Sequence, residues 1–330
     1  MQLPPVIFRP SPAQQRRHKI RNILHSLLLI LGMAAILGTS AFALFGPEGM
    51  VWTLIVGGVT FLLSPSVPPD WVMRLYGARE LSYRDAPDLF RLVALLADRA
   101  ELPQPPRLFW VPSPILNAFA VGRPARAAVA VTDGLLRSLS LRELAGVLAH
   151  EISHIRNDDL WIMQLADSMS RITSLLSWLG QFLLVVNFPL MLTGHTTISW
   201  LAVLALVFAP TLMALLQLAL SRAREYDADL DAAGLTGDPA GLAAALEKLE
   251  RYQGRFWEEI FLPGRRIPEP SLLRTHPPTE ERIRRLLSLY EAVPAERMAA
   301  RGLLPERLVL PDHFVPAGGR PRFRRFGVWY

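Results

Sequence analysis

The sequence contains no cysteine among its 330 residues. Disulfide bonds and thiolate metal sites are therefore excluded, so any metal must be bound by histidine, aspartate or glutamate. Charged residues are also scarce, at 19% of the chain, whereas apolar residues make up 51%, which is high for a soluble protein. The charges are missing from a few long stretches and present elsewhere, which indicates a membrane protein with a globular part.

Four uncharged runs predict membrane-spanning helices. Two of them follow one another near the N-terminus. Two more come from the fifty residues between Arg171 and Arg222, which contain no Asp, Glu, Lys or Arg and are divided near His195. The predicted spans are residues 26–45, 49–69, 174–193 and 199–220.

Two alternatives to these spans exist. The first run also resembles a secretory signal peptide, because a basic segment precedes it and Ala41-Phe42-Ala43 looks like a cleavage site. Its length, and the second run close behind it, favour a retained anchor. The third and fourth runs would fit buried core helices of a soluble protein, but their length without charge favours membrane spans.

Basic residues predict which side of the membrane each segment occupies. Five precede the first span: Arg9, Arg16, Arg17, Lys19 and Arg21. The connectors at 46–50 and around His195 contain none. By the positive-inside rule, the N-terminus, residues 70–171 and residues 222–330 are cytoplasmic. The net charge of +6, with arginines flanking the spans, indicates anionic lipid headgroups rather than nucleic acid as a partner.

The residues outside the spans predict an α+β domain assembled from two segments. In the first, a helix over 85–100 precedes three β-prone runs, and another helix begins with a capping box from Ser140 to Glu143. The β-prone runs are residues 107–111, 117–121 and 127–132. In the second segment, Pro239 and Pro277 stand at helix starts. We therefore expect an α-helical membrane protein with four transmembrane helices and an α+β cytoplasmic domain.

The expected domain organisation follows from the spans. It is a basic N-terminus 1–25, two transmembrane helices 26–69, a first domain segment 70–171, two transmembrane helices 172–221, a second domain segment 222–293 and a basic aromatic tail 294–330. The tail interleaves arginines with aromatic residues, which fits either a disordered basic tail or a segment lying on an anionic leaflet.

The strongest functional signal is the run His150-Glu151-Ile152-Ser153-His154. Residues four apart share one helical face, so the two histidines can bind one metal ion. Glu151 can reach the attacking water without binding the metal, and can take its proton during attack on a peptide carbonyl. Polar residues flank the motif, so we expect it outside the hydrocarbon.

A third metal ligand is predicted downstream at Glu225. Catalytic zinc sites have three protein ligands, and two histidines with one glutamate are a standard set. Asp229 lies four residues further along the same helical face, where it can accept the outer N–H of His150 or His154. The alternative is that this charged segment is only a solvated helix end, but the histidine motif upstream favours the metal site.

Four passages occur in a characteristic order: Asn117–Ala120 with Ala128–Thr132, Ala149–His154, Ser221–Asp229 and Thr275–Thr279. In this order, with two spans before the histidine motif and two after it, the chain resembles the HtpX-type integral-membrane zinc metallopeptidases. It resembles the CAAX prenyl endopeptidases more distantly. The resemblance implies an α+β zinc-metallopeptidase domain with one Zn²⁺ per chain, bound by His150, His154 and Glu225, and Glu151 as the base.

The resemblance implies further roles. The strand near Asn117 and Ala118 is expected to pair with the extended backbone of the substrate. His276 is expected to act in the active site, as a donor to the oxyanion of the tetrahedral intermediate. The alternatives are a strand-edge polar residue for Asn117 and a structural histidine for His276.

The leading hypothesis is therefore a zinc endopeptidase that cuts membrane or membrane-associated proteins in quality control. We expect it in a bacterial inner membrane, with both termini and the active site cytoplasmic. Its expected partners are protein or peptide substrates and the lipid bilayer, with no nucleic acid. One alternative is a CAAX-type prenyl peptidase, which four spans fit poorly. Another is a non-catalytic metal-binding scaffold, which has no need of Glu151.

Overall fold

The computed structural model describes residues 12–63, 68–194, 199–261 and 279–291. They fall into two compact units. Of the described residues, those within 16–65 and 161–223 form the helical unit, and those within 12–15, 66–160 and 224–291 form the mixed unit. The predicted tail 294–330 lies outside the described residues.

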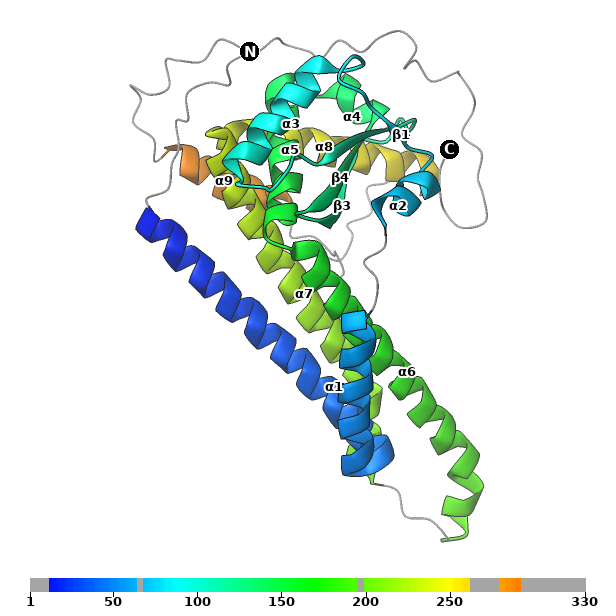
Figure 1. Cartoon of the computed structure of the whole chain (residues 1–330). Coiled ribbons are helices and arrows are strands. Elements are labelled where there is room, and N and C mark those ends of the chain that lie inside the picture. Colours follow the sequence, from blue (N-terminus) through cyan, green and yellow to red (C-terminus); the bar gives the residue numbers. More distant parts are fainter. Residues whose placement is uncertain (1–11, 64–67, 195–198, 262–278, 292–330) are drawn as a thin grey trace. The chain divides into compact units, whose positions relative to one another are not determined.

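The long helices of the structure are α1 (Pro12–Leu63), α6 (Asp159–Leu192) and α7 (Trp200–Thr236) (Figure 1). Among the described residues, these three are long and apolar enough to cross a membrane. Four spans were predicted, and the difference lies in α1, which contains both N-terminal runs. Its backbone leaves the helical conformation at Gly46, with φ 70° and ψ −165°, and Pro47 follows.

The break in α1 has a simple physical cause. Glycine adopts a positive φ without steric cost, and proline cannot supply the N–H that a continuous helix needs. Figure 1 shows the two parts of α1 running in opposite directions from the break. The described residues therefore contain three candidate spanning helices, of which the first is a hairpin of two shorter helices.

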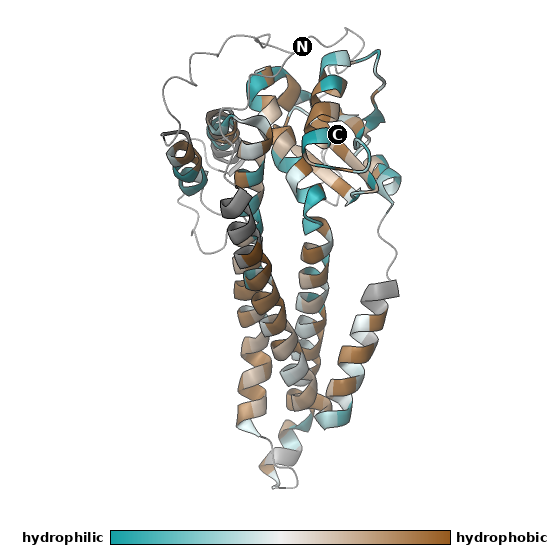
Figure 2. Ribbon diagram, turned by 60° about the vertical axis from the view of Figure 1, so that its left-hand side comes forward, coloured by the Kyte–Doolittle hydropathy of each residue, from teal (hydrophilic) through white to brown (hydrophobic). Residues whose placement is uncertain are grey.

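Many large apolar side chains of the helical unit are exposed. Only 17% of the most apolar windows of α6 and α7 is buried. Trp178 and Leu201, for example, are 76% and 78% exposed, and brown apolar residues predominate along these helices in Figure 2. The alternative of buried core helices is therefore wrong, because such exposure suits lipid and not water.

The mixed unit is built on a four-stranded sheet with the order β1-β2-β4-β3. Its strands are β1 (Arg79–Glu80), β2 (Arg107–Val111), β3 (Ala118–Arg123) and β4 (Arg126–Thr132). β2 and β4 are parallel, whereas β1 and β3 pair antiparallel with their neighbours. The three predicted strands are confirmed, and β3 is an edge strand.

Six further helices belong to the described part of the mixed unit: α2 (Pro69–Leu75), α3 (Pro87–Arg99), α4 (Asp133–Ser138), α5 (Leu141–Arg156), α8 (Pro239–Phe261) and α9 (Thr279–Glu291). The sheet separates two apolar clusters. One includes Trp110 and Val129 with Leu148 and Ile152 of α5. The other includes Phe109 with Met73 of α2. α5 and α2 therefore cover opposite faces of the sheet, as expected from the alternation of side chains along a strand.

The start of α5 is fixed by the predicted capping box. The Ser140 side chain accepts a hydrogen bond from the Glu143 N–H, and the Glu143 carboxylate accepts one from the Ser140 N–H at 2.8 Å. Lys248 of α8 donates to the same carboxylate at 2.7 Å. At Gly146 a Cβ would meet the Leu242 backbone at 2.8 Å, so glycine permits close packing of α5 against α8. These contacts fix the helix that carries the histidine motif.

Candidate metal centre

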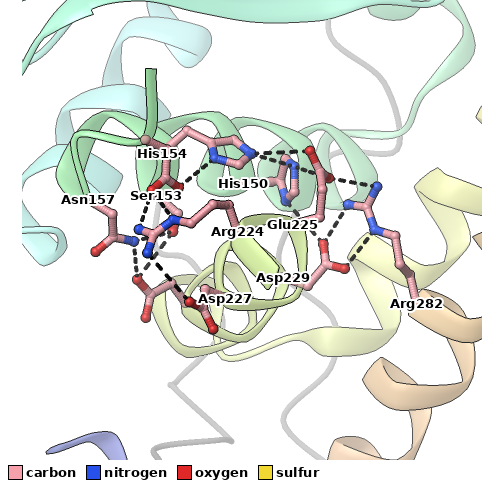
Figure 3. Close-up of polar contacts among 11 residues, drawn as sticks. His150, Ser153, His154, Asn157, Arg224, Glu225, Asp227, Asp229 and Arg282 are labelled. Carbon is pink, nitrogen blue, oxygen red and sulfur yellow. Dashed lines mark hydrogen bonds and ion pairs between the residues drawn. The ribbon is translucent and has the colours of Figure 1, made fainter. Parts of the chain in front are cut away.

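The described part of the site lies within the mixed unit, on α5, on the last turns of α7 and on α9 (Figure 3). α5 places His150 and His154 one turn apart, with their Nε2 atoms 3.1 Å from each other. The two rings are nearly perpendicular, at 88°, with their centroids 4.6 Å apart. The helix therefore directs both imidazoles to one point, as the spacing predicted.

Glu225 of α7 meets the two imidazoles at that point. Its Oε2 lies 3.4 Å from Nε2 of His150, and its Oε1 lies 3.8 Å from Nε2 of His154. One donor atom from each of the three residues falls within 4.8 Å of the others, which makes them the one group of this kind among the described residues.

These distances fit a metal ion. In tetrahedral zinc sites with metal–ligand bonds of about 2.0–2.1 Å, neighbouring ligand atoms are about 3.3–3.4 Å apart. The separations of 3.1, 3.4 and 3.8 Å are close to this value. Two neutral imidazoles and one carboxylate are also the donor types that zinc prefers, so these residues fit the ion.

Asp229 lies behind His150, one turn beyond Glu225 on α7. Its Oδ1 is 3.1 Å from Nδ1 of His150, so of the two histidines left open by the sequence it faces this one. Burial lowers the pKa of His150, but the carboxylates of Asp229 and Glu225 outweigh burial and raise it to about 10. An imidazole facing two carboxylates in this way is held in one orientation.

Arg282 of α9 balances the charge of these two acids. Its guanidinium donates to both oxygens of Asp229, at 2.6 and 2.7 Å, and its Nη1 lies 3.1 Å from Glu225 Oε2. Burial lowers the pKa of Arg282, but Asp229 and then Glu225 outweigh burial and raise it, so the residue stays charged. Arg282 was not predicted as a site residue, although an arginine six residues after His276 on a predicted helix was a possible signal.

His154 has its own carboxylate partner, Asp159, which begins α6. Asp159 Oδ2 lies 2.8 Å from Nδ1 of His154, and Oδ1 is paired with the guanidinium of Arg224. Asp159 is only 2% exposed, so this pair is shielded from solvent. Asp159 was not predicted as a site residue either, because in the sequence it is only one of the polar residues that flank the histidine motif.

A second set of contacts joins α5 to α7 beside the histidines. Asn157 donates to Asp231 at 2.9 Å, and Ser153 donates to the same carboxylate oxygen at 3.2 Å. Ser153 is the second variable position of the histidine motif and is fully buried. The helix that carries both histidines is thus tied to the helix that carries Glu225.

Glu151 lies on α5 beside the two imidazoles but outside the group of three donors. Burial raises the pKa of its carboxyl. The carboxylate accepts a hydrogen bond from the backbone N–H of Ala120 on β3. A carboxyl with a raised pKa, fixed against the edge strand, is suited to accept and return a proton.

The predicted substrate strand is the edge strand β3. The N–H of Asn117 donates to Thr132 Oγ1 at 3.0 Å, and its C=O accepts from the Thr132 N–H at 3.0 Å. The Asn117 backbone therefore faces β4, and by antiparallel alternation the backbone groups of Ala118 and Ala120 face away from it. The hydrogen bond from Ala120 to Glu151 agrees with this direction. His276 lies outside the described residues.

The chain is similar in sequence and in structure to known proteins. The family model "Peptidase family M48" matches residues 84–290. A protein named Protease HtpX homolog from Methylibium petroleiphilum is 34% identical over 290 residues, covering 81% of this chain and 98% of that protein. A protein of the same name from Aquifex aeolicus is 37% identical over 277 residues, covering 79% of this chain and 88% of that protein. Among solved structures, S. mikatae Ste24p matches with a TM-score of 0.49 and 21% identity, covering 82% of this chain and 66% of that chain.

Proposed function

Because the chain belongs to peptidase family M48 and is a membrane zinc metallopeptidase, we propose that its catalytic centre is the group formed by His150, His154 and Glu225. The observation that carries this proposal is the convergence of the three donor groups from two helices, at separations that suit a tetrahedral ion. When bound, zinc supplies a Lewis acid that polarises the scissile carbonyl and favours ionisation of water.

In this proposal Glu151 is the general base. Its carboxylate is oriented by the Ala120 N–H and lies beside the metal ligands without joining them. It accepts a proton from the attacking water and delivers that proton to the amine that leaves. A raised pKa suits the second transfer, because it stabilises the protonated carboxyl that holds the proton between the two steps.

Asp229 and Asp159 act as positioning residues in the same proposal. Each faces the Nδ1 atom of one histidine, so that Nε2 of both rings is left for the metal. Arg282 and Arg224 neutralise these carboxylates, which would otherwise be buried without a counter-charge.

We further propose that the substrate pairs with β3. The N–H and C=O of Ala118 and the C=O of Ala120 face the open edge, where the Ala120 N–H is already hydrogen-bonded to Glu151, and an extended peptide there would present a carbonyl to the metal. Asn117 would then contribute only its exposed side chain to substrate binding, because its backbone N–H and C=O are already hydrogen-bonded to Thr132. His276 is proposed as the donor to the oxyanion.

The finer membrane assignment is also a proposal. Four crossings follow if both halves of α1 span the bilayer, and the arginine distribution then supports a cytoplasmic active site in a bacterial inner membrane. The peptidase domain would comprise segments 70–171 and 222–293, with membrane proteins as substrates. No observation specifically favours the CAAX-type alternative.

The test compares purified wild-type protein with Glu151→Gln, and quantifies both bound zinc and cleavage of casein. The proposal expects one zinc per chain in both proteins and cleavage by the wild type alone. His150→Ala is the matched variant for the metal ligands and should lose zinc as well as activity. Cleavage by Glu151→Gln at the wild-type rate would exclude Glu151 as the base.

A further inference from the structure

The described part of the mixed unit exposes few large apolar side chains, and most of them lie on α2 or at its C-cap. Among its described residues, five such side chains are exposed: Trp71, Leu75, Tyr76, Tyr83 and Leu287. The first three fall on α2 and the residue that caps its C-terminus. Trp71 and Leu75, 57% and 47% exposed, are four residues apart and therefore share one helical face. We call Trp71, Leu75 and Tyr76 the α2 apolar face.

This exposure does not come from a loosely attached helix. Met73, on the other side of α2, is 1% exposed and packs in the cluster with Phe109 on the sheet. Arg107 of β2 pairs with Asp70 of α2 at 2.8 Å. The sheet thus fixes α2 from one side and leaves the α2 apolar face directed outward.

α2 also lies next to the proposed substrate strand. The Tyr76 ring is 4.8 Å from the Phe119 ring on β3. At Gly122, near the end of β3, a Cβ would lie 3.1 Å from Pro69, the first residue of α2. The helix therefore contacts β3 at two points, so whatever covers the α2 apolar face is close to the edge where a peptide would bind.

Chain length indicates which surface covers this face. α2 begins at Pro69, only six residues after Leu63, the last residue of α1. Six steps along an extended chain span at most roughly 22 Å. If the second half of α1 crosses the bilayer, as the proposed function has it, α2 starts within that distance of the point where the chain leaves the hydrocarbon.

The composition of α2 suits the bilayer surface. Tryptophan and tyrosine prefer the interface between acyl chains and water, where an apolar ring and a polar group are both satisfied. The exposed Arg74, which lies between Trp71 and Leu75 in the chain, adds a positive charge that anionic headgroups attract. Tryptophan, tyrosine and arginine are also common in protein interfaces, so the short connection to α1 is what favours the bilayer over a protein partner.

We propose that the α2 apolar face is a membrane-contact surface, inserted among phospholipid headgroups beside β3. A substrate segment that leaves the bilayer would then reach the β3 edge at the membrane surface. The peptidase would favour membrane-anchored chains over soluble ones, although its catalytic centre lies outside the hydrocarbon. This inference rests on the proposed crossing of α1 and on the proposed role of β3.

The natural absence of cysteine allows a direct test in the full-length protein. A nitroxide is attached to Trp71→Cys, Leu75→Cys or the control Tyr83→Cys, in vesicles of phosphatidylethanolamine and phosphatidylglycerol. Its accessibility to oxygen and to a water-soluble nickel chelate is then measured. Positions 71 and 75 should favour oxygen, as expected at the acyl boundary, and position 83 should favour nickel. Nickel accessibility at 71 and 75 equal to that at 83 would overturn the proposal, as would low accessibility to both reagents, which would indicate a protein partner.

Activity gives a second, independent readout. Trp71→Ser with Leu75→Ser should slow cleavage of a membrane-anchored substrate severalfold and leave casein cleavage unchanged, whereas Tyr83→Ser should change neither. If casein is cleaved but positions 71 and 75 are in water, only the membrane-contact surface is excluded. If no protein substrate is cleaved although both positions favour oxygen, the proposed function fails and the surface stands. An impermeant maleimide applied to sealed vesicles reports separately on which side α2 lies.

Discussion

Oδ2 of Asp159 lies 2.8 Å from Nδ1 of His154, while Oδ1 of the same carboxylate is paired with Arg224. Asp159 is the first residue of α6, and Arg224 immediately precedes Glu225 on α7. The ion pair between Asp159 and Arg224 therefore connects His154 with α7, the helix that carries Glu225. Orientation of the His154 ring depends on where the start of α6 meets α7 at Arg224.

Asp159→Ala is expected to weaken zinc binding about 10–100-fold, the usual effect of removing the carboxylate partner of a metal-binding histidine. The imidazole would lose its fixed orientation, and Arg224 would lose its counter-charge. Competition with a zinc-selective chelator measures the affinity. The matched control is the neighbouring Asp158→Asn, because the Asp158 side chain is 45% exposed and lies 3.9 Å from Arg123, away from the histidines. Unchanged zinc affinity in Asp159→Ala would contradict the positioning role.

Arg282→Met is expected to destabilise the protein, because it removes the buried guanidinium that pairs with both Asp229 and Glu225. Breaking such a pair by removing one partner costs about 3–5 kcal/mol. The loss in Tm should be larger in metal-free protein than in zinc-loaded protein, since bound zinc partly replaces the positive charge beside Glu225. Thermal unfolding with and without zinc measures both values.

The control for Arg282→Met is Arg284→Met on the exposed side of α9. It should change Tm little in either state. Equal Tm losses for the two variants would mean that Arg282 does not neutralise the acids of the centre.

Much of the centre could be predicted from the sequence because its signals are local. The helical spacing of His150 and His154, and of Glu225 and Asp229, depends only on 3.6 residues per turn. Arg282 could not be found in this way, since it meets Asp229 across 53 residues of chain and belongs to a different helix. Its role follows from the packing of α9, which no periodicity in the sequence describes.

The fold, too, could be predicted where neighbouring residues encode it and not where it depends on long-range contacts. The capping box at Ser140 and the strands β2, β3 and β4 were predicted, because each is encoded by neighbouring residues. The two residues of β1 were missed, since they form a strand only through pairing with Trp110 and Phe109. The two N-terminal runs were predicted as separate spans, whereas in the structure both belong to α1, and a break at Gly46 and Pro47 separates its two halves.

Stability should depend on pH through Glu143. Burial raises the pKa of its carboxyl, but Lys248 and the Ser140 groups outweigh burial and hold the pKa below the ordinary value of 4.5. A group whose pKa is lower in the folded state stabilises the protein above its unfolded pKa, and this contribution is lost as pH falls through the folded pKa. Wild-type protein should therefore lose more Tm below pH 4.5 than Glu143→Gln, which has already lost the charge. The control Glu247→Gln, on the exposed surface with Arg251, should follow the wild type. Parallel curves for wild type and Glu143→Gln would contradict the prediction.

The outward direction of the Ala118 backbone leads to a sharp test of substrate pairing. Proline at position 118 removes one N–H from the open edge of β3, where no strand of the described sheet needs it. Proline is tolerated at edge positions whose N–H faces away from the sheet, so Ala118→Pro should fold and bind zinc normally. Because an added substrate strand does need that N–H, kcat/KM for protein substrates should fall by about 10-fold or more, equivalent to about 1.4 kcal/mol of lost binding in the transition state. Ala118→Val changes the side chain and keeps the N–H, and should therefore retain most of the activity. If the proline variant cleaves casein as fast as the valine variant, the substrate does not pair with β3 at this residue.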